Sequence, residues 1–259
     1  MCAMWIELPL GRQFVETAVE RSDGPVAVLV HGAGSDHRVW AHQSVGLARR
    51  GWRVLVVDLP GHGRSEGAAP DSIPALADTL AALLEAAGVP PGLVAGHSMG
   101  ALAALDFAAR YPDRLTQLVL VGVAARMPVH PALLAAARDD LPHAAAMIAG
   151  WGHASEEGED DAANRKAEAT RLLLEQSAPG VLAAGLAACD SYDGTWAAAQ
   201  IGVPTRLILG GADKMSPAKA GLALTPLISG ARATILPGAG HMLMSVRPDA
   251  VLDALSDQA

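Results

Sequence analysis

Residues 92–103 read Gly-Leu-Val-Ala-Gly-His-Ser-Met-Gly-Ala-Leu-Ala: an apolar run, then Gly96-His97-Ser98-Met99-Gly100, then an alanine-rich segment. The apolar run predicts a buried strand, and the alanine-rich segment predicts a helix. A Gly-x-Ser-x-Gly sequence at such a strand-to-helix turn is typical of a nucleophile elbow. The glycines let neighbouring segments approach closely, and the N-terminus of the helix offers amide donors to a developing oxyanion.

Strands and helices are predicted to alternate on both sides of this turn. Apolar runs predict strands at 13–19 (an edge strand), 25–30, 53–57, 92–95, 117–121, 205–209 and 233–236. Apolar spacings of three and four residues predict helices at 39–50, 73–87, 99–111 and 248–256. This order predicts an α/β fold with a mostly parallel central sheet flanked by helices.

The alternation is interrupted between residues 126 and 196, where the sequence is alanine-rich, contains several prolines and has no convincing strand. We interpret this stretch as an inserted all-helical cap, or lid, and residues 1–125 and 197–259 as one core domain. The cap contains an acidic run from Glu156 to Asp161. A solvated loop is its simplest interpretation, but its role stays open.

Composition excludes several classes of protein. The 259 residues are 51% hydrophobic, enough to bury a sizeable core, and the net charge of −8 disfavours nucleic acid as a partner. No apolar run approaches the roughly 18 residues of a membrane-spanning helix, and the N-terminus has no basic region of a secretory signal, so we expect a cytoplasmic protein. Cys2 and Cys189 lack a disulfide or metal-ligand pattern, and we expect neither a metal nor another cofactor.

A serine nucleophile needs a histidine base and an acid that orients it. His241 follows the predicted strand 233–236, and Asp213 follows the predicted strand 205–209. Both therefore lie at the C-terminal ends of strands, where open α/β sheets place their chemistry, and the order Ser, Asp, His suits this type of elbow. Residues 31–34, His-Gly-Ala-Gly, follow another strand, so the amide of Ala33 is expected to face the reaction centre together with that of Met99.

These segments, together with Asp58-Leu-Pro-Gly-His-Gly-Arg-Ser65, resemble the α/β-hydrolase fold superfamily over nearly the whole chain outside the cap. The resemblance implies Ser98 as the nucleophile, Asp213 as the acid and His241 as the general base and acid. It also implies the amides of Ala33 and Met99 as the oxyanion hole. One departure is Ala101, which stands where many members have glycine.

These residues exclude some reactions of the superfamily and leave several others as candidates. Dehalogenases and epoxide hydrolases of this fold use a carboxylate nucleophile. This chain has Ser98 at that position, so both classes are disfavoured. A carboxylesterase for a small to medium, partly apolar acyl substrate is the leading interpretation, and a lactonase or a C–C bond hydrolase follows; His97 stands where many C–C hydrolases have asparagine. A non-catalytic ligand-binding protein and a cofactor-free perhydrolase or haloperoxidase are further alternatives. The oligomeric state stays open.

Apolar side chains of the cap, with a few neighbours, are the candidates for the substrate pocket. They are Met127, Met147, Trp151, His153 and Met242. Such residues also pack in ordinary cores, so the identity of the acyl group stays open.

Overall fold

The computed structural model describes residues 2–19, 23–153 and 161–257. Its eight strands form one sheet in the order β1-β2-β4-β3-β5-β6-β7-β8. The strands are β1 (Cys2–Leu8), β2 (Gly11–Val19), β3 (Val26–Val30), β4 (Arg53–Val57), β5 (Gly92–His97), β6 (Leu115–Val121), β7 (Thr205–Gly210) and β8 (Arg232–Leu236). Strands β1 and β2 run antiparallel to their neighbours, and the others are parallel.

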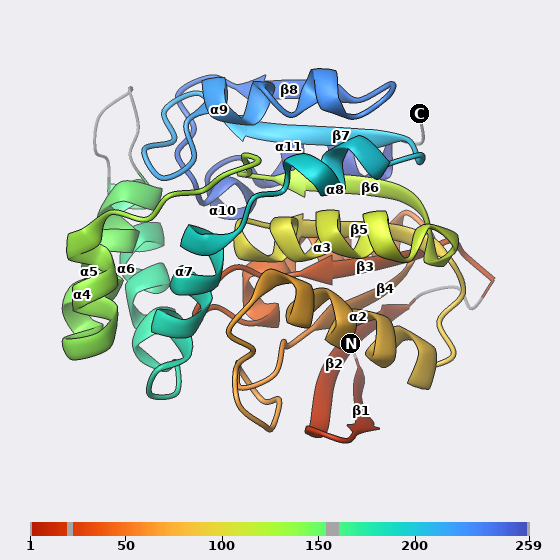
Figure 1. Cartoon of the computed structure of the whole chain (residues 1–259), viewed down its shortest axis with the longest axis horizontal. Coiled ribbons are helices and arrows are strands. Elements are labelled where there is room, and N and C mark those ends of the chain that lie inside the picture. The colour runs from red at the N-terminus through yellow and green to blue at the C-terminus, as the bar shows by residue number, and fades with distance from the viewer. Residues whose placement is uncertain (1, 20–22, 154–160, 258–259) are drawn as a thin grey trace.

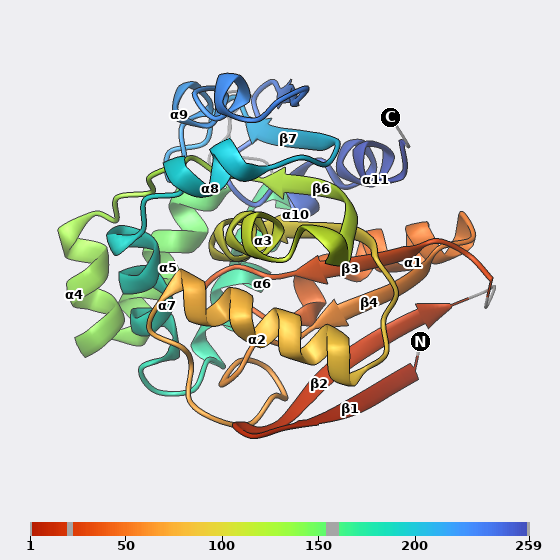
Figure 2. The same cartoon turned by 45° about the vertical axis from the view of Figure 1, so that its right-hand side comes forward.

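Helices cover both faces of the sheet and bury its side chains in two apolar layers (Figure 2). One face carries α2 (Ile73–Ala86), α3 (Met99–Arg110) and α8 (Thr195–Gln200), and α3 packs against both of the others. The opposite face carries α1 (Ala41–Arg49) and α11 (Pro248–Ser256). Strand β5 lies at the centre with every residue buried, so its C-terminal turn is held rigidly from both sides.

A third apolar cluster lies within the helices that follow β6. These helices are α4 (Pro131–Asp139), α5 (Leu141–Gly152), α6 (Asp161–Glu175) and α7 (Val181–Ser191). They gather beyond the C-terminal ends of the parallel strands (Figure 1). Ala33 and Met215, on loops that leave the sheet, pack against this cluster, so the helices cover the edge where those loops emerge.

Most predicted elements match the structure, but the N-terminal edge differs. Residues 13–19 were expected to form an edge strand, whereas β2 is the second strand and β1 occupies the edge. The two form a hairpin in which Leu8 pairs with Gly11. The sequence of β1 alternates weakly and has only one buried residue, Ile6, so its membership depends on pairing with β2. The short helices α9 (Ala218–Leu222) and α10 (Leu243–Val246) were also not predicted.

No helix in the described ranges is long and apolar enough to cross a membrane. Cys2 is exposed, Cys189 is buried, and both are free thiols.

Candidate active site

Ser98 occupies the turn between β5 and α3 with φ 54° and ψ −117°. Among the described residues other than glycine, it is the only one with a positive φ. Such backbone strain costs about 1–3 kcal/mol and persists only where the surroundings enforce it. A Cβ at Gly96 would lie 2.1 Å from the carbonyl oxygen of Gly100, and one at Gly100 would lie 2.3 Å from that of His31. Both glycines are therefore required for α3 to start this close to β3 and β5.

His241 and Asp213 form a buried hydrogen-bonded pair on the loops that follow β8 and β7. The Nδ1 of His241 donates to Oδ2 of Asp213 over 2.7 Å. The second carboxylate oxygen, Oδ1, accepts from the amides of Met215 and Ser216 at 2.8 Å each. These bonds fix the carboxylate, and the carboxylate in turn fixes the tautomer and direction of the imidazole.

The environment keeps Asp213 ionised. Burial alone would raise the pKa of this carboxyl group. The neighbouring His241 and the two donating amides outweigh burial, and the pKa lies below its usual value. The pair is thus arranged to stabilise positive charge on the imidazole.

Ser98 and His241 line the same cavity, which has a volume of about 590 Å³. The Nε2 of His241 is buried and has no hydrogen-bond partner in the described structure. This nitrogen is the acceptor in the tautomer that Asp213 selects, because Nδ1 carries the proton. A buried, unpaired acceptor in a cavity shared with a serine hydroxyl is available to take a proton.

His97 lies beside this pair but makes a different contact. Its Nε2 donates to the backbone carbonyl of His241 over 3.0 Å, and the two rings lie 4.8 Å apart. Burial and the nearby His241 lower the pKa of His97 to about 3, so it is neutral at ordinary pH. His97 therefore holds the loop of His241 without contributing charge.

Ala33 and Met99, the residues predicted to supply oxyanion donors, lie near Ser98 in different ways. Ala33 lines the large cavity and also a cavity of about 30 Å³ that Ser98, His97 and His241 share. Met99 is the first residue of α3, and the first amides of a helix lack intrahelical acceptors. The loop of Ala33 is fixed by His31, whose Nε2 accepts from the amide of Leu59 at 3.0 Å.

Some of the residues expected to contact substrate line the two cavities next to Ser98, and others do not. Met127 and Trp151 line the 590 Å³ cavity, and Met242 lines the small one. Met147 instead packs against the core of the helices after β6. The Nε2 of His153 pairs with the hydroxyl of Thr170 at 2.8 Å, and His153 lines neither cavity.

The sequence analysis missed several residues of the cavity wall. Lys214 and Ser216 line it and follow Asp213 on the same loop. Their place directly after the predicted acid was a signal that could have found them. Arg126, His130 and Leu186 also contribute, but only the packing of the helices brings them there.

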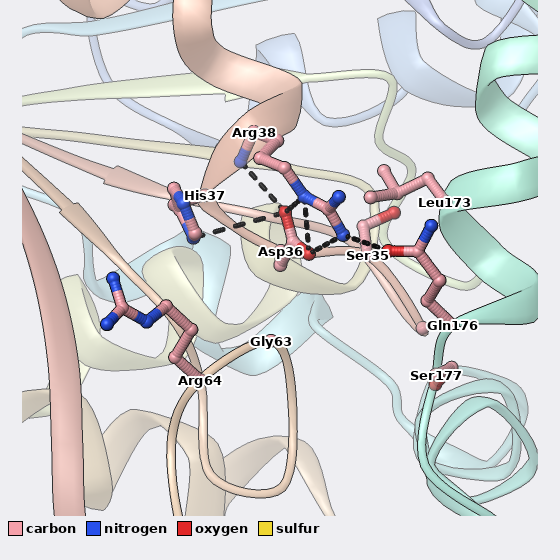
Figure 3. A pocket seen from close by; sticks show the side chains of 10 residues that line it. Ser35, Asp36, His37, Arg38, Gly63, Arg64, Leu173, Gln176 and Ser177 are labelled. Atoms are coloured by element: carbon pink, nitrogen blue, oxygen red, sulfur yellow. Dashed lines mark hydrogen bonds and ion pairs between the residues drawn. The ribbon is translucent and has the colours of Figure 1, made fainter.

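A second cavity, of about 380 Å³, lies between the loop after β3 and the end of α6 (Figure 3). Asp36 accepts from the Arg38 guanidinium at 2.7 Å, and Arg38 also donates to Gln176 at 2.9 Å. The Nδ1 of His37 donates to Asp58 at 2.9 Å. One ligand atom from each of Asp36, His37 and Asp58 lies within 4.8 Å of the others, although the sequence spacing did not suggest this grouping. Hydrogen bonds already engage both carboxylates, so we interpret the cluster as a hydrogen-bonded network that stabilises the fold rather than as a metal site.

The order and direction of the strands are those of the α/β-hydrolase fold. A family model described as the alpha/beta hydrolase family matches residues 27–254, and the chain belongs to that family.

Relatives within the family carry several activities in their names. The chain is 30% identical over 244 residues to pimeloyl-[acyl-carrier protein] methyl ester esterase of Neisseria meningitidis serogroup C, covering 86% of this chain and 90% of that protein. The crystal structure of the enol-lactonase from Burkholderia xenovorans LB400 superposes with a TM-score of 0.88 and 27% identity over 98% of each chain. A 2-hydroxy-6-oxo-6-phenylhexa-2,4-dienoate hydrolase of Comamonas testosteroni is 32% identical over 108 residues, which is 40% of this chain and 38% of that protein.

Proposed function

We propose that this protein is a serine hydrolase that cleaves carboxylic esters through an acyl-enzyme on Ser98. The observation that carries the proposal is the relation of Ser98 to His241. Ser98 is held at a strained turn in the cavity that His241 also lines, and the free Nε2 of His241 lies opposite the nitrogen bonded to Asp213. The name of the esterase relative supports the same class of reaction.

In the proposed first half-reaction, the Ser98 oxygen attacks the ester carbonyl carbon while its proton moves to Nε2 of His241. The tetrahedral intermediate collapses, the bond to the alcohol oxygen breaks, and the alcohol leaves with that proton. Asp213 stays ionised and stabilises the imidazolium between these steps. In the second half-reaction, His241 takes a proton from water, the hydroxide attacks the acyl-enzyme, and the Ser98 oxygen leaves with the proton.

The oxyanion of each tetrahedral intermediate is proposed to accept from the amides of Ala33 and Met99. Ala33 shares the cavity with Ser98, Met99 is the first residue of α3, and the positive end of the α3 dipole lies at that turn; these observations support this role. Removing one such donor typically costs about 10²–10³ in kcat.

Residues 126–196 are proposed to form the cap of this site, and residues 1–125 and 197–259 its catalytic core. Support comes from the separate apolar cluster of α4–α7 and from their place over the strand ends (Figure 1). Met127, Leu133, Trp151 and Leu186 give the wall an apolar stretch, which suits a small to medium acyl chain.

Hydrolysis of a lactone is the second candidate, because a lactone is a cyclic ester and requires the same steps. The enol-lactonase structure, similar over nearly its full length, favours it.

A fluorophosphonate probe tests the proposal without knowledge of the acyl group. Wild type should gain the mass of a single adduct, and Ser98→Ala and His241→Ala should gain none. Turnover of p-nitrophenyl butyrate should fall by at least about 10⁴-fold in Ser98→Ala. Equal labelling or equal turnover in that variant would refute a nucleophilic Ser98.

A further inference from the structure

The wall of the 590 Å³ cavity carries an unusual balance of charge. Asp and Glu outnumber Lys and Arg by 27 to 19 in this chain. Among the described residues that line the cavity, however, Arg126 and Lys214 are charged and none is a carboxylate. The cavity therefore presents positive charge within an acidic protein.

The two cations differ in how they are paired. Arg126 makes an ion pair with Asp193, which lies across a β-bridge from it. Lys214 is exposed and forms no ion pair with any other residue that the structure describes. Its neighbour Asp213 is engaged by His241 and two amides. Lys214 is thus the cation available to a ligand.

Ser216 provides an independent sign of an unfilled polar site. Ser216 lines the cavity, and the residue exposes only 3% of its surface. Its hydroxyl nonetheless has no hydrogen-bond partner in the described structure. A buried polar group without a partner is costly, so a ligand oxygen that accepts from this hydroxyl would be stabilised.

We propose that Lys214 and Ser216 form a carboxylate-binding subsite, and that the preferred substrates are esters carrying a carboxylate a few carbons from the reacting carbonyl. The inference rests on the proposed ester hydrolysis at Ser98. Both residues follow Asp213 on one loop, so an anion held there lies in the same cavity as Ser98. The apolar stretch of the wall accommodates the hydrocarbon segment between the two polar ends.

A matched pair of esters tests this preference. Mono-p-nitrophenyl adipate carries a free carboxylate, and methyl p-nitrophenyl adipate carries a neutral methyl ester in its place. We expect wild type to have a kcat/KM about tenfold higher for the charged ester, an advantage that shrinks in 0.5 M NaCl because salt screens the ion pair. No preference for the charged ester would overturn the subsite.

Variants of the loop locate the effect. Lys214→Met should remove the preference mainly through KM, Lys214→Glu should reverse it, and Ser216→Ala should weaken binding of the charged ester a few-fold. Lys219→Met is the matched control, because Lys219 is exposed on α9 and does not line the cavity. Turnover of the neutral ester and the preference for the charged ester should both stay within about twofold of wild type in Lys219→Met. A preference retained in Lys214→Met would overturn the role of Lys214.

A binding measurement separates this inference from the proposed function. Ser98→Ala is titrated calorimetrically with monomethyl adipate and with dimethyl adipate, and the titrations are repeated in Ser98→Ala/Lys214→Met. Tighter binding of the monoester by about tenfold, lost in the double variant, would support the subsite even if wild type hydrolysed neither p-nitrophenyl ester. Ser98-dependent hydrolysis without this difference in binding would leave the hydrolase intact and overturn the subsite.

Discussion

The cavity at Ser98 and the cavity at Asp36 differ in how their ionisable side chains are bonded, although each also holds a buried hydroxyl without a partner, that of Ser216 in the first and that of Ser177 in the second. Around Asp36 both carboxylates are engaged, Asp36 by Arg38 and Asp58 by His37 and the amide of Arg64. In the cavity at Ser98, the Nε2 of His241 and the hydroxyl of Ser216 are buried without partners.

This difference separates groups that stabilise the fold from groups that are ready to react. A charged cluster whose bonds are complete gains little from a ligand, because a ligand would have to replace them. An unpaired buried acceptor costs stability in the free protein, and substrate or transition state can recover that cost. Substitutions in the cavity at Ser98 should therefore lower activity, and substitutions in the cavity at Asp36 should lower stability.

Asp213→Asn gives the largest effect among the variants that keep Ser98 and His241. The amide side chain can present its NH₂ to Nδ1, which favours the wrong tautomer and leaves the imidazolium without a counter-charge. We expect kcat for p-nitrophenyl butyrate to fall about 10³- to 10⁴-fold with little change in KM. Asp36→Asn, in the other cavity, is the control. More than a tenth of wild-type activity in Asp213→Asn would contradict the role of Asp213.

His97 tests whether positioning alone matters at the reacting site. His97→Leu removes the donor to the His241 carbonyl, and we expect kcat to fall about 10- to 100-fold with KM within about threefold. His97→Gln keeps an NH donor and should recover most of the loss. Equal losses in both variants would show that the ring is needed for packing rather than for this hydrogen bond.

The sequence predicts the local parts of this picture better than the parts that depend on packing. The turn at Ser98 was predictable because Gly96 and Gly100 are required by close backbone contacts that leave a short local pattern. The strand β1 was not, because it depends on pairing with β2 more than on its own burial.

Substrate-wall residues are the least predictable, because the packing of helices decides which side chains reach the cavity. Met147 and Trp151 lie one turn apart on α5, and the sequence gives no basis for predicting different surroundings for these two large apolar residues. Both pack against the helical core, but only Trp151 also lines the cavity. Lys214 differs from these two, because its position directly after the predicted acid Asp213 could have indicated that it lies near the site.

Substitution of Asp36 should lower the stability of the protein and leave its activity largely unchanged. Asp36 caps a short 3-10 helix (His37–Trp40) by accepting from the Arg38 amide at 2.9 Å, and it also binds the Arg38 guanidinium. Asp36→Ala removes both contacts and should lower the free energy of unfolding in urea by about 1–2 kcal/mol. Turnover of p-nitrophenyl butyrate should stay within about twofold of wild type. A hundredfold loss of turnover with unchanged stability would reverse the comparison between the cavities.

The smallest expected effect is the pH dependence of stability that His37 contributes. Burial lowers the pKa of this imidazole, but the hydrogen bond and charge of Asp58 outweigh burial and raise it above its ordinary value. A group whose pKa is raised by folding stabilises the folded state below its unfolded pKa of about 6.5, and this contribution is lost as pH rises through the folded value. Wild type should therefore lose stability relative to His37→Gln between pH 6 and pH 8.5, measured by urea unfolding. The exposed His143→Gln should track wild type, and a constant difference between wild type and His37→Gln would show that the Asp58 pair does not depend on protonation.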